Sequence, residues 1–408
     1  MKSAVTFFLR YLLIAGAIAG AYYSSILARA SSLFSRDTTD SVRAAVQLVP
    51  YNSDYVARLA AHDESQRLAL LKRAVQINPF DYQSLIQLGL MAEINDSDTK
   101  TAESYYLKAA AVNHMYLPKW TLTNFYFRQQ SLSEFFHWAN ETLKITPKSG
   151  DPVFTQMWLM SQDQARLSAA VPDRPRTLIQ YTWFLSNSRQ FTAIPPIIQR
   201  LVRVVGDDDP RAWGRDDLIA SSLDRVLASG DFHTGLQIWT TLRDGRWLAE
   251  NVPDADHPVT NGTFHLPFFG HGFDWVSTES EGVHIQQFVD EPSIDIGLSG
   301  DEPEHCELLR QYVAVEPGFL YQLQWKAEAQ SIAPGSGLAW HLRPSNSVKG
   351  TDINIESSDL LHAPQTWQFV APPNAEGFML TLEYNRALGH TRPTGHFTLR
   401  SVAMNRQQ

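Results

Sequence analysis

Polar side chains that could bind a ligand alternate with apolar ones in three segments of the last third of the chain. In 321–327, 338–343 and 378–385, apolar or aromatic residues recur at every second position. This alternation predicts strands that bury one face and leave the other outside. Amides, a guanidinium and a carboxylate suit sugar hydroxyls, which donate and accept hydrogen bonds. The candidate carbohydrate-binding residues on the expected outer faces are Gln322, Gln324, Lys326, His341, Arg343, Glu383 and Asn385.

Two tryptophans are candidates for the aromatic platform that a sugar site normally adds to its polar groups. Either Trp275 or Trp367 could supply this platform. The alternative interpretation is a solvated sheet face with its tryptophans in the core, because an exposed face needs polar residues merely to stay soluble.

Catalytic motifs are absent from the sequence. It contains no glycine-rich phosphate loop, no His-Glu-x-x-His, no Gly-x-Ser-x-Gly and no glycine-rich dinucleotide turn. A glycosidase needs two carboxylates about 5–9.5 Å apart, and the sequence shows no partner for Glu383. Acidic neighbours would raise the pKa of Cys306 and make it a poor nucleophile. We therefore expect a protein without catalytic activity and without a cofactor.

Four histidines raise the question of a metal site. Pairing of the first and last strands of the C-terminal segment could bring together His265, His271, His390 and His396. Imidazole is a common ligand of transition metals, but this spacing matches no ligand signature. We expect no metal site.

Charge divides the 408-residue chain into two parts. The formal net charge of −9 falls entirely within residues 257–408, which hold 8 basic and 17 acidic residues. This break indicates a domain boundary near residue 257. There is no basic excess, so nucleic acid is not an expected partner.

The N-terminus is predicted to be a membrane element, covering residues 1–30. Residues 11–27 carry no charge, and about 17–25 apolar residues suffice to span a bilayer. An uncleaved signal anchor is the favoured interpretation. Ala28-Arg29-Ala30 also allows a cleaved signal peptide, and a buried helix is the third alternative. The expected location is a bacterial inner membrane, crossed once, with the body of the protein in the periplasm.

A recurring phrase marks residues 41–150 as a helical repeat. Ala45-Val-Gln-Leu-Val-Pro50 is echoed at 74–79, and more weakly at 110–113 and 142–147. Intervals of 35 and 33 residues, after a shorter one of 29, resemble the 34-residue tetratricopeptide repeat (TPR), whose second helix ends in such a phrase. Only Leu88-Gly89 of the family's central motif survives. The resemblance implies a solenoid whose groove binds a protein partner.

Aromatic residues crowd two helices of this repeat. They could grip the partner or simply pack the core of the repeat, and they are Trp120, Phe125, Tyr126, Phe127, Phe135, Phe136 and Trp138.

Prolines interrupt the regular period after residue 150. We interpret 151–250 as an irregular helical continuation of the solenoid, with a separate globular helical domain as the alternative. Turn residues at 253–258 predict a linker.

Short alternating segments separated by turn residues predict an antiparallel β-sandwich at 258–405. Phrases such as Asn261-Gly-Thr-Phe, Gly272-Phe-Asp-Trp and Trp367-Gln-Phe-Val occur in an order that resembles the galactose-binding-like jelly roll of many carbohydrate-binding modules. Such modules often hold calcium through acidic residues in the opening and closing strands. Here Thr263 and His396 are among the residues found instead, so we expect no calcium site.

The predicted fold class is multidomain α plus β: a transmembrane helix, a TPR-like solenoid and a C-terminal jelly roll. The predicted function is a non-catalytic, membrane-anchored envelope scaffold that binds a protein partner and contacts polysaccharide, in exopolysaccharide or envelope assembly. One alternative is a purely structural interaction protein whose sandwich binds no sugar. The other is a glycan-active enzyme with a site assembled from distant residues.

Overall fold

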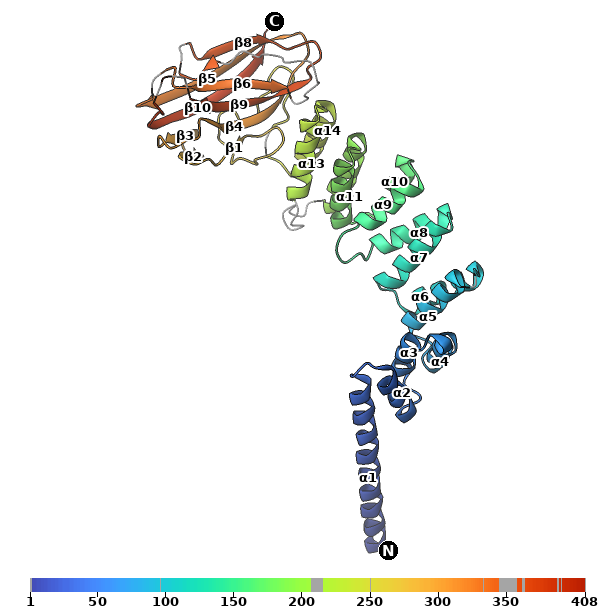
Figure 1. The fold of residues 1–408 in the computed structure, drawn as a ribbon. Helices are drawn as coiled ribbons and strands as arrows, with labels where there is room; N and C mark the ends of the chain where they lie inside the picture. The colour runs from blue at the N-terminus through green and yellow to red at the C-terminus, as the bar shows by residue number, and fades with distance from the viewer. Residues whose placement is uncertain are drawn as a thin grey trace. The chain divides into compact units, whose positions relative to one another are not determined.

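The computed structural model divides the chain into two compact units, Met1–Gln162 and Asp163–Gln408. It describes residues 2–95, 97–206, 216–249, 251–332, 334–344, 358–361, 364–386, 389 and 391–407. Helices occupy the N-terminal part and two antiparallel sheets the C-terminal part (Figure 1). The predicted fold class, an α-helical TPR-like part followed by a β-sandwich, is confirmed.

Helix α1 (Lys2–Phe34) is the predicted N-terminal apolar element. Among the described residues, its segment Arg10–Phe34 is the one helix that is long and apolar enough to cross a membrane. A signal sequence would have the same length and composition. The last turns of the helix differ from the rest, because Ala30 is completely buried.

Pairs of antiparallel helices build the rest of the first unit. Each helix is short, and several begin at a side-chain cap: Asp81 and Asp98 accept hydrogen bonds from backbone N–H groups of the first turn. The helices are α2 (Thr39–Leu48), α3 (Ser53–His62), α4 (Arg67–Ile77), α5 (Tyr82–Ile94), α6 (Thr99–Val112), α7 (Tyr116–Arg128), α8 (Leu132–Leu143) and α9 (Asp151–Met160), with a 3-10 turn at Glu64–Gln66.

The recurring phrase ends the second helix of each pair, as the TPR resemblance implies. It closes α2, α4, α6 and α8 in turn. Gly89 shows why the helices of one pair need a small residue: a Cβ atom there would lie 2.4 Å from the ring of Tyr106. Successive pairs are tied by Glu93, which accepts hydrogen bonds from the Tyr106 hydroxyl at 2.8 Å and from Arg128 Nε at 2.7 Å.

Helices continue irregularly in the second unit. They are α10 (Gln164–Ala170), α11 (Pro175–Asn187), α12 (Ile194–Val205), α13 (Asp216–Ala228) and α14 (Phe232–Asp244), with a 3-10 turn at Phe191–Ala193. Pro175 and Pro195 lie in the first turns of α11 and α12, where the missing N–H has no partner to lose. The prolines therefore start helices here.

Two five-stranded antiparallel sheets form the sandwich. Sheet 1 has the order β1-β4-β9-β6-β7 and sheet 2 the order β2-β3-β10-β5-β8. The strands are β1 (Val276–Ser277), β2 (Val283–Phe288), β3 (Ser293–Leu298), β4 (His305–Ala314), β5 (Leu320–Gln330), β6 (Leu338–Pro344), β7 (Ser358–Asp359), β8 (Thr366–Val370), β9 (Gly377–Asn385) and β10 (Gly395–Arg406).

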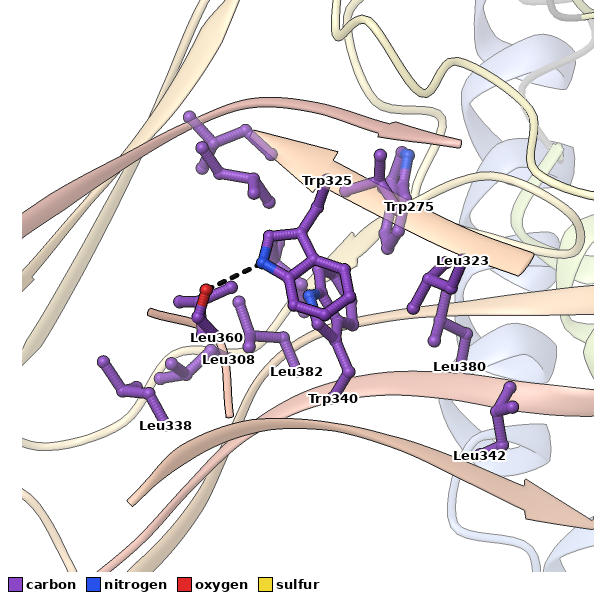
Figure 2. Close-up of a cluster of buried hydrophobic side chains, with 14 of the residues drawn as sticks. Trp275, Leu308, Leu323, Trp325, Leu338, Trp340, Leu342, Leu360, Leu380 and Leu382 are labelled. Atoms are coloured by element: carbon purple, nitrogen blue, oxygen red, sulfur yellow. Dashed lines mark hydrogen bonds between the residues drawn. The ribbon is translucent and has the colours of Figure 1, made fainter. Parts of the chain in front are cut away.

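Tryptophans from different segments meet in the core between the sheets (Figure 2). Trp340 lies 6.1 Å from Trp275 and 6.3 Å from Trp325 between ring centroids. The Trp325 indole N–H donates to the Leu360 carbonyl at 2.7 Å, which satisfies a buried donor. Leucines from both sheets fill the remaining space, so the inward residues of the alternating segments form one core.

The last helical pair packs against the sandwich within the second unit. The ring centroid of Phe232 lies 6.2 Å from that of Phe273 and 6.3 Å from that of Tyr312. Trp239 has no exposed surface and lies 5.7 Å from Phe273. A Cβ atom on Gly377 would lie 2.3 Å from the Phe232 ring. We call this contact the helix–sandwich joint.

Polar bonds complete the joint. Asp224 on α13 accepts hydrogen bonds from the Gly272 N–H at 2.7 Å, and its other carboxylate oxygen lies 2.7 Å from His271 Nδ1. The segment expected as a linker, 253–258, also contacts the sandwich, because Asp256 pairs with Arg406 on β10. Just before it, the Asn251 carbonyl accepts from the Trp239 indole N–H. The predicted domain boundaries at 150, 250 and 258 stay predictions beside this two-unit division.

Candidate functional site

The outer face of sheet 1 carries a group of polar side chains centred on strand β9. The register places Glu383 between Glu307 on β4 and Ala339 on β6. Two residues earlier on β9, Thr381 lies between Arg310 on β4 and His341 on β6. The group that we call the β9 polar face comprises His305, Glu307, Arg310, His341, Arg343, Thr381, Glu383 and Asn385.

Glu383 is the most deeply placed member of the β9 polar face. It lies on the outer side of the sheet, yet only 1% of it is exposed. Arg343 Nη2 bonds one carboxylate oxygen at 2.6 Å, and the Thr381 hydroxyl donates to the other at 2.8 Å. A buried carboxylate needs such partners because its desolvation is costly. Glu383 is therefore a fixed acceptor that orients the arginine.

The groups around Glu383 are more accessible. The Arg343 side chain is 51% exposed and that of His305 is 56% exposed. His305 Nδ1 lies 2.6 Å from Asn385 Oδ1 and 3.8 Å from Glu383 Oε2. Together they leave a guanidinium, an imidazole and an amide for a ligand to meet.

His341 is a half-buried member of the β9 polar face. Burial lowers the pKa of His341, and Arg343 and His305 act in the same direction, while Glu383 opposes them. Its Nε2 atom is buried and has no hydrogen-bond partner among the described residues.

Two carboxylates, Glu307 and Glu383, lie on neighbouring strands of this face. A register shift between Glu307 and Leu309 creates this pairing, and no sequence pattern indicated it. Glu307 is bonded by the Thr278 hydroxyl at 3.1 Å and by Arg310 at 3.4 Å. Both carboxylates are thus bonded by donors from the same face.

The structure brings four of the nine predicted site residues together: His341, Arg343, Glu383 and Asn385 belong to the β9 polar face. Glu383 lies on the outer face of sheet 1, as the alternation predicted, but it is buried there beside Arg343. His305, Glu307, Arg310 and Thr381 were missed as site residues by the sequence reasoning. Their place in the site follows from the pairing of β4 with β9, which includes a register shift that local alternation does not indicate.

Three predicted residues lie elsewhere. Gln322, Gln324 and Lys326 belong to β5, on the outer face of sheet 2. That face is on the opposite side of the sandwich from the β9 polar face, so the nine residues cannot form one site. Gln324 donates to Gln322 at 3.1 Å, and Gln324 and Lys326 are exposed on this face.

Neither tryptophan stands as an exposed platform. The prediction is wrong for Trp275, which has no exposed surface and packs in the core against Phe264. Trp367 is half-buried on the edge strand β8, and its ring lies 5.6 Å from that of Phe369. It faces the same side as the inward Leu323 opposite it.

Metal ligands do not converge among the described residues. No group of three or more His, Cys, Asp or Glu side chains there could hold an ion. His265 lies beside Thr263, His271 pairs with Asp224, and His396 approaches Asp295 and Gln330. His390 lies outside the described residues.

A second candidate site lies in the solenoid of the first unit. A groove of about 660 Å³ opens between α3, α5 and neighbouring segments. Small side chains form part of its wall, with amides and charges around them. The residues lining it include Ala57, Arg58, Ala61, Gln83, Ser84 and Gln87. The amides and small residues could accommodate an extended backbone.

The aromatic residues of α7 and α8 mostly pack the repeat. Phe125, Tyr126 and Phe135 are buried, and the ring centroids of Tyr106 and Phe125 are 5.3 Å apart. Trp120, Phe127, Phe136 and Trp138 are half-buried. They do not line the groove described above.

Comparisons with known proteins give weak similarities to both parts of the chain. No family model matches the sequence, and no significant relative was found among curated proteins. A CBM4 structure is similar over 36% of this chain and 98% of its own, at 18% identity and a TM-score of 0.27. PilF of Pseudomonas aeruginosa matches 50% of this chain and 92% of its own, at 16% identity and a TM-score of 0.25. YrrB, a TPR protein with an unusual peptide-binding site, matches 44% and 93%, at 15% identity and a TM-score of 0.23.

Proposed function

We propose that this protein is a non-catalytic, membrane-anchored scaffold that binds a protein partner through its solenoid and a polysaccharide through its sandwich. The observation that carries the proposal is the β9 polar face. There Arg343, His305, Asn385 and His341 surround a buried acceptor, Glu383, on one sheet. Sugar hydroxyls need paired donors and acceptors, and this face offers both without a free catalytic acid.

The solenoid groove would take the protein partner. Its amides, Gln83 and Gln87, project from one helix beside small residues of another. Amide side chains can pair with the N–H and C=O groups of an extended peptide. We infer an extended segment of a partner as the occupant of the groove.

A membrane anchor at α1 would bring both sites to a membrane. We propose a bacterial inner membrane crossed once by α1, with the body in the periplasm. Polysaccharide and protein would then meet at the envelope, and a role in exopolysaccharide or envelope assembly follows from this arrangement. These assignments rest on the order of the parts along the chain, since fold by itself does not fix function.

Binding of soluble polysaccharides to the full chain in detergent micelles tests the sugar assignment. A His305→Ala/Asn385→Ala variant removes an exposed imidazole and a half-buried amide of the β9 polar face and keeps the Arg343–Glu383 ion pair. Gln322→Ala/Gln324→Ala on the other sheet is the matched control. The proposal predicts that only the His305→Ala/Asn385→Ala variant fails to retain polysaccharide. It also predicts that the wild type releases no reducing ends from the polysaccharide. Release of reducing ends by the wild type would support the enzyme alternative instead.

The helix–sandwich joint favours a second candidate, a structural protein whose sandwich binds no sugar. Phe232, Trp239 and Phe273 bury aromatic surface between the helices and the sandwich. A module fixed by such a contact could serve only to cap the solenoid. A well-folded protein that retains a partner but no polysaccharide in the same assay would establish this function.

A further inference from the structure

Helix α1 is longer than a bilayer needs. Its 33 residues extend about 50 Å at 1.5 Å per residue, whereas the hydrocarbon core is about 30 Å thick. Side chains from Tyr11 to Ser25 are all exposed. Ala30 is completely buried. The helix therefore has an apolar, exposed part followed by a part that packs against protein.

The last turns of α1 belong to the solenoid. The ring centroid of Phe34 lies 4.6 Å from that of Tyr55 on α3, and Phe34 packs on the core of the first helices. Just beyond it, Asp37 is bonded by Arg58 Nε at 2.7 Å and by His62 at 2.9 Å. Both partners come from α3, as does Tyr55, so the end of α1 and the turn after it are fixed to α3.

Helix α2 turns back beside this part of α1 (Figure 1). Its 10 residues span about 15 Å, the length of about ten residues of α1. The loop that follows α2 carries Tyr51, which is 84% exposed. Arg29, Tyr22 and Tyr23 are also exposed on α1. Tyrosine is enriched at membrane interfaces, where its ring and hydroxyl meet lipid and water.

We propose that α1 is one rigid element shared by the bilayer and the solenoid, and that the Tyr51 loop rests in the lipid headgroup layer. This inference rests on the membrane anchoring proposed above. Helix α2 would then lie directly at the membrane surface, because no flexible linker separates the membrane-spanning part of α1 from the part on which α2 packs. The surface that Tyr51 contacts is the lipid bilayer, since the loop lies beside a helix already embedded in it.

The same geometry favours the uncleaved anchor over the cleaved signal peptide. Cleavage after Ala30 would remove Ala30 itself, which is completely buried in the folded chain. It would also remove the helix on which α2 packs. The mature protein is therefore expected to keep its N-terminus.

The second helical pair supplies a matched control position. Phe80 follows α4 as Tyr51 follows α2, and it is 73% exposed. The pair α3 and α4 separates it from α1. If Tyr51 is exposed only because it is a loop residue, positions 51 and 80 should be equally accessible to water when the protein is in a membrane.

Site-directed spin labelling of the full chain in phosphatidylglycerol–phosphatidylethanolamine nanodiscs tests this difference. Cys306 is buried and would be replaced by serine, so that Tyr51→Cys and Phe80→Cys are labelled separately. We expect collisions with oxygen to exceed those with a water-soluble nickel chelate at position 51, and the reverse at position 80. Equal, nickel-accessible labels at both positions would overturn the inference.

Two further readouts separate this inference from the proposed anchor. Intact mass gives the N-terminus of the protein extracted from membranes, and an alkaline carbonate wash shows whether the span is integral. A chain that begins beyond Ala30, or that is released by the wash, would overturn both proposals. An intact, wash-resistant chain with an aqueous label at position 51 would overturn only the inference about the loop.

Discussion

A single methyl group at Gly377 should loosen the helix–sandwich joint. Gly377 lies at the start of β9, where a Cβ atom would come within 2.3 Å of the Phe232 ring on α14. Its backbone is not in the left-handed region, so Gly377→Ala adds no backbone strain. The clash with a buried ring is thus the principal cost of the substitution.

The expected magnitude follows from overpacking. Forcing a buried ring out of place costs about 1–3 kcal/mol, which lowers the melting temperature of a unit of this size by about 2–4 °C per kcal/mol. Gly297 is the matched control, because it is also a strand glycine and its added Cβ atom would meet nothing closer than 3.9 Å. Gly297→Ala should change the melting temperature little.

A double-mutant cycle identifies the source of the effect. Phe232→Ala should cost about 3–5 kcal/mol, since Phe232 is buried. In that background Gly377→Ala should be nearly neutral, because the ring that it would displace is gone. The assay is thermal unfolding of the full chain in detergent, followed by tryptophan fluorescence and circular dichroism. Equal effects of Gly377→Ala and Gly297→Ala, or strict additivity with Phe232→Ala, would refute the packed joint.

Three further substitutions test the repeat and the β9 polar face. Gly89→Ala should destabilise the first unit by about 1–3 kcal/mol in chemical denaturation, because its Cβ atom would lie 2.4 Å from the Tyr106 ring; an unchanged midpoint would contradict this close packing. Arg343→Gln should lower stability by about 1–3 kcal/mol by leaving Glu383 buried without its ion-pair partner, and adding Glu383→Gln should restore part of the loss. Burial lowers the pKa of His341 in the folded chain. As the pH falls below about 6.5, the ordinary histidine pKa, the unfolded chain therefore binds more protons than the folded chain. The free energy of unfolding should fall with the pH for this reason. His341→Asn should make the melting temperature less dependent on pH between 7 and 5, and an unchanged slope would argue against this role.

Local patterns in the sequence predicted much of the fold. Alternation correctly placed Tyr321, Leu323 and Trp325 in the core, because side chains of a strand must point to opposite faces. The recurring phrase correctly marked where the second helix of each pair ends. In both cases the signal lies within a few consecutive residues.

The candidate site depended on contacts between distant segments, which local patterns do not contain. Alternation shows that Gln324 and Glu383 point outward, but only the strand order shows that they lie on different sheets. The register shift after Glu307 turns both Leu308 and Leu309 inward and brings Glu307 beside Glu383. Gly377 reads as a turn residue in the sequence, and its contact with Phe232 has no local signal.

Hydrogen exchange of the full chain, with and without a retained polysaccharide, tests the central claim most directly. The β9 polar face predicts protection on binding in peptides from β4, β6 and β9, and no change in β5. Protection confined to β5, or no protection anywhere in a sandwich that retains polysaccharide, would contradict the placement of the site. Failure of the folded protein to retain any polysaccharide would contradict the proposed sugar-binding function itself.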